Sequence, residues 1–283
     1  MTKCLSTGQV EKYHDDGALA PVRVFSSERA TDYLRKLERF EIDRPEIAKS
    51  VLHIKPHLVF CWADELVRAP EILDVIEDLI GPDILVYNSA VWIKEPGDGT
   101  SVGWHQDCAY YPLEPAVQVT AWIALTDSVE DNGNVKYIAG SHRLGELKHS
   151  ANRGTTSLLS QGQSIHRAFD QGLVKNMALL PGEMSLHHTR TVHFSEPNHS
   201  ARRRIGFGVN YMPASVQNRG SVRHTAMLVR GVDKFKNFDQ EPRVQCDMDS
   251  AAQLAHRDAV ARFRAARVEA VAAHDSKFQV MSQ

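Results

Sequence analysis

The chain has 283 residues, of which 42% are apolar, and its formal net charge is −2 at pH 7. This length and apolar content are enough for a full hydrophobic core, and the nearly balanced charge gives no bulk attraction to nucleic acid or to an anionic membrane surface. The first residues lack the apolar core of a signal peptide, and no apolar run reaches the roughly 20 residues that span a bilayer.

The first 82 residues are predicted to be mainly helical. One helix is expected over Ser6–Asp16, and a second runs from Ser26 through Phe40. A third begins near Pro70, a residue that the first turn of a helix tolerates. Its apolar residues recur at helical spacing until Gly81-Pro82 ends the helix.

After Pro82 the pattern changes to short strands separated by polar turns. The first strand is expected over residues 84–94, which are rich in β-branched and aromatic side chains. Over residues 117–126 the side chains alternate, so that Ala121 and Ile123 face one way while Trp122 faces the other. Further strands are expected over residues 135–139, 184–188, 191–195 and 204–212.

Strands framed by helical ends indicate a mainly β fold with flanking helices, and we expect a double-stranded β-helix, that is, a jelly-roll or cupin-like barrel. We expect one domain over residues 1–283, with a helical part to about residue 82, a jelly-roll core over about 83–215 and a C-terminal extension with a helix over about 216–283.

The tail over residues 249–273 is rich in Ala and Arg and carries a helical stripe of small apolar residues. We expect this stripe to pack on the outside of the barrel, and a homodimer contact through the helix is the alternative. The four cysteines are scattered, without a Cys-x-x-Cys pair, which favours a cytoplasmic location without disulfides.

The most informative motif is His105-Gln106-Asp107, which lies after a turn rich in Gly and Pro. In a strand, residues i and i+2 project from the same face, so both side chains can reach one metal ion. We expect His193 to supply a third ligand, with His187 and His188 as rivals close by. Two imidazoles and one carboxylate form the facial triad that holds non-haem Fe(II) and leaves positions open for oxygen and a co-substrate. We therefore predict a catalytic iron site here.

Arg204 heads a predicted strand in which Gly206, Gly208 and Asn210 share its face. Glycines weaken strands, and the close approach of a ligand is one reason to tolerate them. A guanidinium that grips a carboxylate in a fork, beside two positions without side chains, suits an acidic co-substrate. Its neighbours Arg202 and Arg203 are expected to form a solvated basic patch.

Together these motifs resemble the phytanoyl-CoA dioxygenase family of Fe(II)- and 2-oxoglutarate-dependent oxygenases. The matching blocks are Trp104–Asp107, Thr120–Leu125, Asn132–Asn134 leading into Gly140–His142, Pro181–Glu183, and His193-x-Ser195-x-Pro197-Asn198-x-Ser200 with Arg204. The likeness extends from about Gln9 to Pro242.

The resemblance implies that His105, Asp107 and His193 hold the iron within a double-stranded β-helix. It also implies that 2-oxoglutarate chelates the metal and that its far carboxylate meets Arg204, supported by the Ser195 hydroxyl. Oxygen and 2-oxoglutarate would be consumed, succinate and CO2 released, and the substrate hydroxylated.

Further co-substrate contacts are expected around this anchor. Trp122 matches a family position that lines the co-substrate pocket, and Lys55 resembles a further basic contact. Asn88 and Lys94 share one face of their predicted strand, from which both side chains can point toward the pocket.

Hydroxylation is favoured over chlorination, because halogenating relatives replace the carboxylate ligand with a small residue and Asp107 is present here. Desaturation or epimerisation with the same cofactors is an alternative outcome. A non-catalytic jelly-roll module that binds a metal or metabolite is a second alternative, and a metallohydrolase is a third. Neither the binding module nor the metallohydrolase explains the presence of Arg204 as well as a 2-oxoglutarate-dependent oxygenase does.

The substrate is expected to be a small metabolite, without a nucleic-acid or membrane partner. Tyr110 and Tyr111 are expected to form a pocket wall, and His188 to support the metal ligands. Four basic residues make a small anion of phosphonate or carboxylate type a candidate: Lys55, Lys94, Arg190 and Arg230.

Overall fold

The computed structural model describes residues 2–151 and 163–280. Its helices are α1 (Thr7–Asp16), α2 (Ser27–Asp43), α3 (Pro45–Leu52), α4 (Cys61–Val67), α5 (Pro70–Ile80) and α6 (Ser250–Val280). Its longer strands are β1 (Ala18–Arg23), β2 (Ile84–Lys94), β3 (Val102–His105), β5 (Val119–Ala124), β6 (Val135–Ile138), β9 (Val174–Met177), β10 (Glu183–His188), β11 (His193–Ser195), β12 (Arg204–Pro213) and β14 (Thr225–Arg230). Two-residue strands are β4 (Leu113–Glu114), β7 (Ser150–Ala151), β8 (Gln163–Ser164), β13 (Gln217–Asn218) and β15 (Asp239–Gln240).

Local signals at the helix ends explain why the predicted N-terminal helices form. The Ser6 hydroxyl accepts a hydrogen bond from the backbone N–H of Gln9, whose side chain in turn accepts one from the Ser6 N–H. This capping box satisfies two otherwise unpaired donors at the start of α1. Gly17 ends α1 with φ +77°, a conformation that favours glycine. Pro70 occupies the first turn of α5, as predicted.

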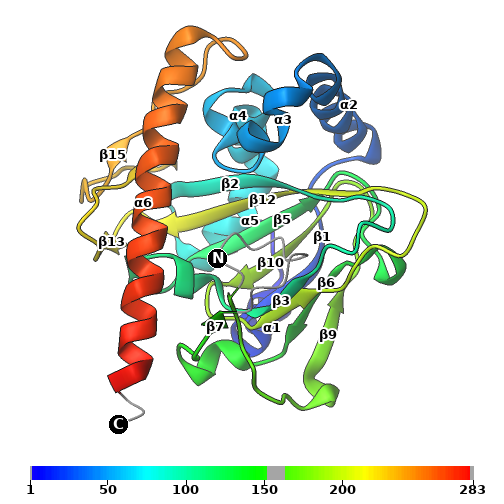
Figure 1. Cartoon of the computed structure of the whole chain (residues 1–283), viewed down its shortest axis with the longest axis vertical. Coiled ribbons are helices and arrows are strands. Elements are labelled where there is room, and N and C mark those ends of the chain that lie inside the picture. Colours follow the sequence, from blue (N-terminus) through cyan, green and yellow to red (C-terminus); the bar gives the residue numbers. More distant parts are fainter. Residues whose placement is uncertain (1, 152–162, 281–283) are drawn as a thin grey trace.

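Most of the described strands form two sheets, as expected for a double-stranded β-helix, while β4 pairs with β13 and β7 with β8 as separate two-stranded sheets. The larger sheet has the order β1-β10-β5-β12-β2-β14-β15, and the smaller has the order β3-β11-β6-β9 (Figure 1). The predicted strands are confirmed, but the larger sheet also takes β1, β14 and β15 from outside the predicted core of 83–215. Strands β1 and β14 extend the sheet by antiparallel pairing with β10 and β2, and β15 pairs in parallel with β14.

The larger sheet has one face toward the helices and one toward the smaller sheet. On β12, Phe207 and Val209 join a buried cluster that includes side chains of α2, α4 and α5. Helices α2, α3 and α4 lie on this side of the sheet (Figure 1). The alternate residues of β12, among them Arg204 and Asn210, face the space between the two sheets. The period of two in the sequence therefore separates core residues from site residues.

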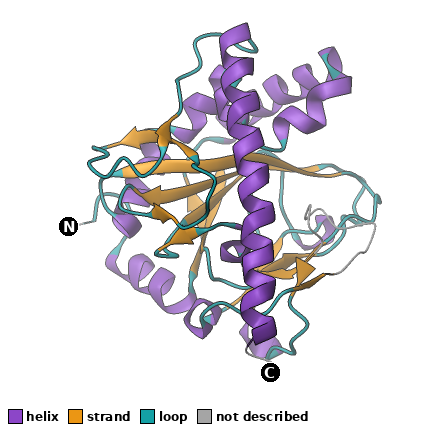
Figure 2. Cartoon of the chain, turned by 60° about the vertical axis from the view of Figure 1, so that its left-hand side comes forward, coloured by secondary structure: helices purple, strands orange, loops and turns teal. Residues whose placement is uncertain are grey.

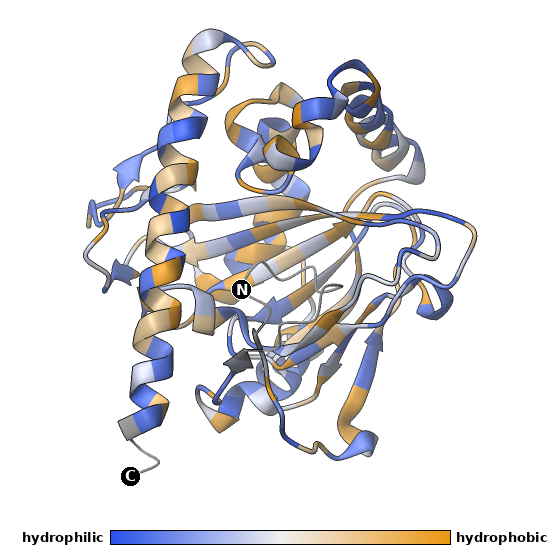
Figure 3. Cartoon of the chain, viewed as in Figure 1, coloured by the Kyte–Doolittle hydropathy of each residue, from blue (hydrophilic) through white to orange (hydrophobic). Residues whose placement is uncertain are grey.

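Helix α6 runs along one side of the molecule and across the strands (Figure 1 and Figure 2). Polar and apolar segments alternate along it (Figure 3), as expected for a helix with one buried side. Its stripe is buried within this chain at Ala252, Ala259, Phe263, Ala266 and Ala270. Packing against the barrel is thus the arrangement observed. Among the described residues, no helix is long and apolar enough to cross a membrane.

Candidate active site

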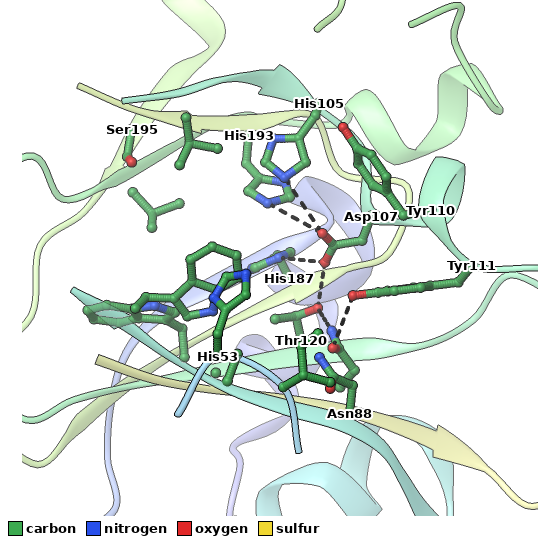
Figure 4. Close-up of a pocket in the computed structure, with 18 of the residues that line it drawn as sticks. His53, Asn88, His105, Asp107, Tyr110, Tyr111, Thr120, His187, His193 and Ser195 are labelled. Carbon is green, nitrogen blue, oxygen red and sulfur yellow. Dashed lines mark hydrogen bonds and ion pairs between the residues drawn. The ribbon is translucent and has the colours of Figure 1, made fainter. Parts of the chain in front are cut away.

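A pocket lies between the two sheets and brings together most of the residues that the sequence singled out (Figure 4). Strands β2, β5, β10 and β12 of the larger sheet supply one side, and β3, β6 and β11 of the smaller sheet supply the other. Tyr110 and Tyr111 line it, as predicted, and Phe263 and Arg267 of α6 complete the wall.

Three potential metal ligands converge in this pocket. His193 is the antiparallel partner of His105 in the pairing of β11 with β3. The Nε2 atoms of His105 and His193 lie 3.7 Å and 3.8 Å from Oδ1 of Asp107. One ligand atom from each residue lies within 4.8 Å of the others. The sequence therefore identified a set of residues that the fold does bring together.

The backbone reason for this convergence differs from the one expected. His105 ends β3, whereas Asp107 begins the short 3-10 turn Asp107–Tyr110, so the two residues do not share one strand. Between them Gln106 is fully buried, and its side-chain amide donates to the carbonyls of Gly145 and Arg190. These hydrogen bonds fix the turn that carries the carboxylate toward the histidines.

Both histidines have the protonation pattern that a metal ligand needs. Nδ1 of His105 lies 2.9 Å from the carbonyl oxygen of Gly103, and Nδ1 of His193 lies 2.9 Å from that of Thr191. A carbonyl only accepts, so each Nδ1 carries the proton and each Nε2 presents its lone pair to Asp107. Burial lowers the pKa of both imidazoles, which keeps them neutral at pH 7.

Asp107 is held through its second oxygen. The Thr120 hydroxyl donates to Oδ2 of Asp107 at 2.7 Å and accepts from the Asn210 amide at 2.8 Å. The Tyr111 hydroxyl donates in turn to Oδ1 of Asn210 at 3.3 Å (Figure 4). Burial alone would raise the pKa of Asp107, but the hydrogen bond with His187 holds it well below its usual range. The group is therefore a carboxylate at neutral pH.

The supporting histidine is His187 rather than His188, the residue expected in this role. Nε2 of His187 lies 3.3 Å from Oδ2 of Asp107. His188 instead accepts a hydrogen bond from the backbone of Arg190 and lies beside His142, outside the pocket. The period of two could have identified His187, because the apolar Leu186 belongs to the core face of the same strand.

Arg204 lies at the start of β12 with 2% of its surface exposed. Its guanidinium carbon is 5.1 Å from the centre of a Trp122 ring, and its Nε has no hydrogen-bond partner among the described residues. Burial lowers the pKa of Arg204 to about 10, so it remains a cation at neutral pH. A buried cation without a paired anion is costly. This position therefore fits the carboxylate of a bound co-substrate, and Ser195 lines the pocket as well.

The glycines of β12 have a different purpose from the one expected. A Cβ atom at Gly206 would overlap the indole of Trp122, and one at Gly208 would lie 2.9 Å from Nε1 of Trp92. The space above both glycines is therefore taken by two tryptophans of this chain rather than by a ligand. These indoles line the pocket and make its floor apolar.

Of the remaining predicted co-substrate contacts, Asn88 lines the pocket, whereas Lys94 and Lys55 do not. Asn88 lines the pocket, and its Oδ1 has no hydrogen-bond partner among the described side chains and backbone groups. Lys94 is the β-sheet partner of Arg204 but donates to the carbonyl of Glu196 instead of lining the pocket. Burial, and then Arg204, lower the pKa of Lys94 to about 7.

Lys55 is not brought to the pocket. Its ammonium lies 2.5 Å from Oε1 of Glu241, and both side chains are 1% exposed. His57 contacts the other oxygen of that carboxylate at 3.1 Å. This buried ion pair joins the N-terminal region to the segment after β15. Arg230 is also paired elsewhere, with Asp74 on α5 at 2.6 Å.

The sequence of this chain is similar to a known family and to several of its members. The sequence model of the phytanoyl-CoA dioxygenase family matches residues 4–206. A "probable alpha-ketoglutarate-dependent hypophosphite dioxygenase" of Stutzerimonas stutzeri is 32% identical over 187 residues, which are 62% of this chain and 62% of the relative. An ectoine dioxygenase of Bordetella bronchiseptica is 24% identical over 218 residues, which are 69% of this chain and 71% of the relative.

Solved structures are similar over more of the chain. A non-heme monooxygenase, ThoJ in its apo form, has 31% sequence identity and a TM-score of 0.84, covering 93% of this chain and 98% of that chain. A structure of CytC3 with Fe(II) and alpha-ketoglutarate has 23% identity and a TM-score of 0.66, covering 88% of this chain and all of that chain (100%). The second likeness supports the fold, which is the predicted double-stranded β-helix.

Proposed function

This chain belongs to the phytanoyl-CoA dioxygenase family, and we propose that it is an Fe(II)- and 2-oxoglutarate-dependent dioxygenase that hydroxylates a small metabolite and releases succinate and CO2. The observation that carries the proposal is the content of one pocket. Two neutral imidazoles and a carboxylate face one another there, and the same pocket holds the buried guanidinium of Arg204, whose Nε has no hydrogen-bond partner among the described residues.

The donor set fits iron. His105 and His193 would each bind through Nε2, because each Nδ1 is occupied by a backbone carbonyl. Asp107 would bind through Oδ1, because Thr120 and His187 occupy Oδ2. Iron and 2-oxoglutarate, when bound, supply the oxygen activation that protein side chains cannot. The protein contributes ligands of fixed protonation and orientation.

The co-substrate side of the pocket is built around Arg204. Its guanidinium would bind the far carboxylate of 2-oxoglutarate, and the hydroxyl of Ser195 would add a donor. The guanidinium lies over the ring of Trp122, which together with Trp92 keeps the surroundings apolar. Asn88 is assigned to the pocket wall. Lys94 lies beside Arg204 without lining the pocket, so we assign it an influence on co-substrate binding only through Arg204.

The substrate is proposed to be small and anionic. The relative named for hypophosphite supports this, since that substrate is a small oxyanion. The four basic residues singled out in the sequence are a poorer support, because Lys55, Lys94 and Arg230 are all engaged elsewhere and Arg190 does not line the pocket. A homodimer through the apolar stripe of α6 is not proposed, because that stripe is buried within the chain.

The test is an oxygen-labelling assay with the purified protein. The protein would be incubated with Fe(II), 2-oxoglutarate and ¹⁸O2 and a panel of small phosphonates, phosphinates, carboxylates and amino acids. We expect succinate to form in step with a product that carries one ¹⁸O atom. A product that has lost two hydrogens or changed only its stereochemistry would identify desaturation or epimerisation. Succinate no higher than in an iron-free control, with every compound, would contradict the proposed function.

A further inference from the structure

The pocket contains a second arginine, which lies outside the part of the chain that matches the family model. Arg267 of α6 lines the same pocket as the histidines and Arg204. It is half-buried, and its Nε is fully buried without a hydrogen-bond partner among the described residues. On the same helix, Arg262 pairs with Asp239 at 2.7 Å and with Asp258 at 3.0 Å. Within residues 2–151 and 163–280, Arg267 is thus a cation without a paired carboxylate.

Arg267 lies close to the proposed iron site. Its guanidinium carbon is 5.1 Å from the centre of the Tyr110 ring and 5.8 Å from that of Phe263. The Tyr110 ring is in turn 6.1 Å from the ring of His105. One aromatic side chain therefore separates the guanidinium from a metal ligand. Burial, and then Arg267, lower the pKa of His53, another residue that lines the pocket.

The two pocket arginines lie toward different ends of the pocket. Arg204 begins β12. Asn210, six residues further along the strand, accepts a hydrogen bond from the Tyr111 hydroxyl. The Tyr111 ring is 6.0 Å from that of Phe263, which lies beside Arg267, so Arg267 lies toward the Asn210 end of the strand. Six residues of strand correspond to about 20 Å at the usual rise per residue. One small anion does not span that length. An acidic co-substrate at Arg204 would leave Arg267 free for a second anion.

We propose that Arg267 binds the oxyanion head group of the primary substrate and so determines the substrate class of this pocket. The inference rests on the proposed function, since it assigns 2-oxoglutarate to Arg204. A phosphonate, phosphinate or carboxylate has the acceptor oxygens that a guanidinium binds in a fork. Because a single ring separates Arg267 from His105, the oxidised bond lies within a few atoms of the head group, and the substrate is small.

The test measures binding of probes that differ in charge. Protein loaded with Fe(II) and 2-oxoglutarate under anaerobic conditions would be titrated with methylphosphonate and its neutral dimethyl ester, and with acetate and acetamide. Binding is followed by calorimetry and by the shift of the visible absorption band of the loaded protein. The variants are Arg267→Leu and Arg267→Lys, and Arg264→Leu is the matched control, because Arg264 is exposed on the same helix.

We expect the wild-type protein to bind at least one of the two anions and to bind its neutral counterpart at least about tenfold more weakly. Arg267→Leu should weaken anion binding by about tenfold to a hundredfold, Arg267→Lys should restore part of it, and Arg264→Leu should match the wild type. Which anion binds tells whether the head group is of the phosphonate or the carboxylate type.

Equal affinity of the wild type for an anion and its neutral counterpart would overturn the assignment, even if the Leu variant failed to fold. Unchanged anion binding in a folded Arg267→Leu protein would overturn it as well. A protein that forms no absorption band at all would contradict the proposed function instead. The calorimetric titration does not depend on that band, so it still decides whether Arg267 binds the anion.

Discussion

Nε2 of His187 lies 3.3 Å from Oδ2 of Asp107, while the imidazoles of His105 and His193 face Oδ1 of the same carboxylate (Figure 4). Thr120 donates to Oδ2 as well, at 2.7 Å. The carboxylate is therefore held by one oxygen and presents the other toward the two neutral histidines. This arrangement fixes the orientation of a ligand before any metal arrives, which groups behind a metal site generally do.

Removing this support should weaken metal binding without removing a ligand. We predict that His187→Leu lowers the affinity for Fe(II) by about tenfold to a hundredfold, because Asp107 loses a hydrogen bond that orients it. Anaerobic calorimetric titration with Fe(II) measures the change. His188→Leu is the matched control on the same strand, since His188 lies outside the pocket. Equal affinities in the wild type and His187→Leu would remove His187 from the proposed site.

Arg204→Ala should raise the dissociation constant for 2-oxoglutarate far more than that for the primary substrate. Loss of a two-point, charge-assisted contact costs on the order of 2–3 kcal/mol, which corresponds to a factor of about 30 to 150. Titration of the Fe(II)-loaded protein with 2-oxoglutarate measures it. Arg203→Ala is the control, because Arg203 pairs with Glu41 and Glu95 away from the pocket. If the Arg204 variant binds 2-oxoglutarate normally, the co-substrate anchor lies elsewhere.

Gly206→Ala should displace the indole of Trp122, which occupies the space of the missing side chain. Overpacking of this kind costs about 1–3 kcal/mol, so urea unfolding should show a lower free energy of unfolding. Binding of 2-oxoglutarate should weaken too, because Trp122 supports Arg204. Gly8→Ala is the control, since a Cβ there would meet nothing within 4 Å. A Gly206→Ala protein as stable as the wild type would show that the indole moves at no cost.

Lys94 should make the stability of the fold depend on pH. Its pKa in the folded protein is about 7, well below the ordinary value of 10.5. Between those values the unfolded chain holds a proton that the folded chain has released, so the free energy of unfolding rises with pH. Lys94→Met removes this contribution, and its stability relative to the wild type should fall by about 2 kcal/mol between pH 7 and pH 9.

Urea unfolding at both pH values checks this prediction. Lys136→Met is the control, because the hydrogen bonds that Lys136 donates to Glu130 and Glu196 raise its pKa, and it does not titrate in that range. A constant difference between Lys94→Met and the wild type across the two pH values would mean that the Lys94 ammonium keeps its ordinary pKa.

Much of the fold could be predicted because it depends on local periodicity. The alternation on β5 and β12 separates core residues from pocket residues, so the sequence alone predicts that Trp122 and Arg204 lie on the pocket side. The ends of α1 were equally readable from Ser6 and Gly17, and those of α5 from Pro70 and Gly81. Strand β1 was missed because it pairs with β10, which is remote in the sequence. Local patterns carry no information on such partners.

The site residues that belong to a sequence motif could be predicted. Those whose position depends on contacts between distant segments could not. His105, Asp107 and His193 come together although Asp107 lies beyond the end of its strand. Lys55 looked like a ligand contact, but its ion pair with Glu241 is a contact between distant segments. Arg267 looked like one of many arginines in a tail helix. Only the path of α6 across the strands brings it to the pocket.

The most direct measurement is an anaerobic titration of the metal-free protein with Fe(II) and 2-oxoglutarate, followed by visible absorption. We predict a weak charge-transfer band in the wild type once both are present, and no band in Asp107→Ala, which lacks the carboxylate ligand. Asp127→Ala, a control at a carboxylate paired with Arg202, should develop the same band as the wild type. Absence of the band in the wild type, together with tight binding of Zn(II), would contradict the account and favour a hydrolytic or a binding-only site.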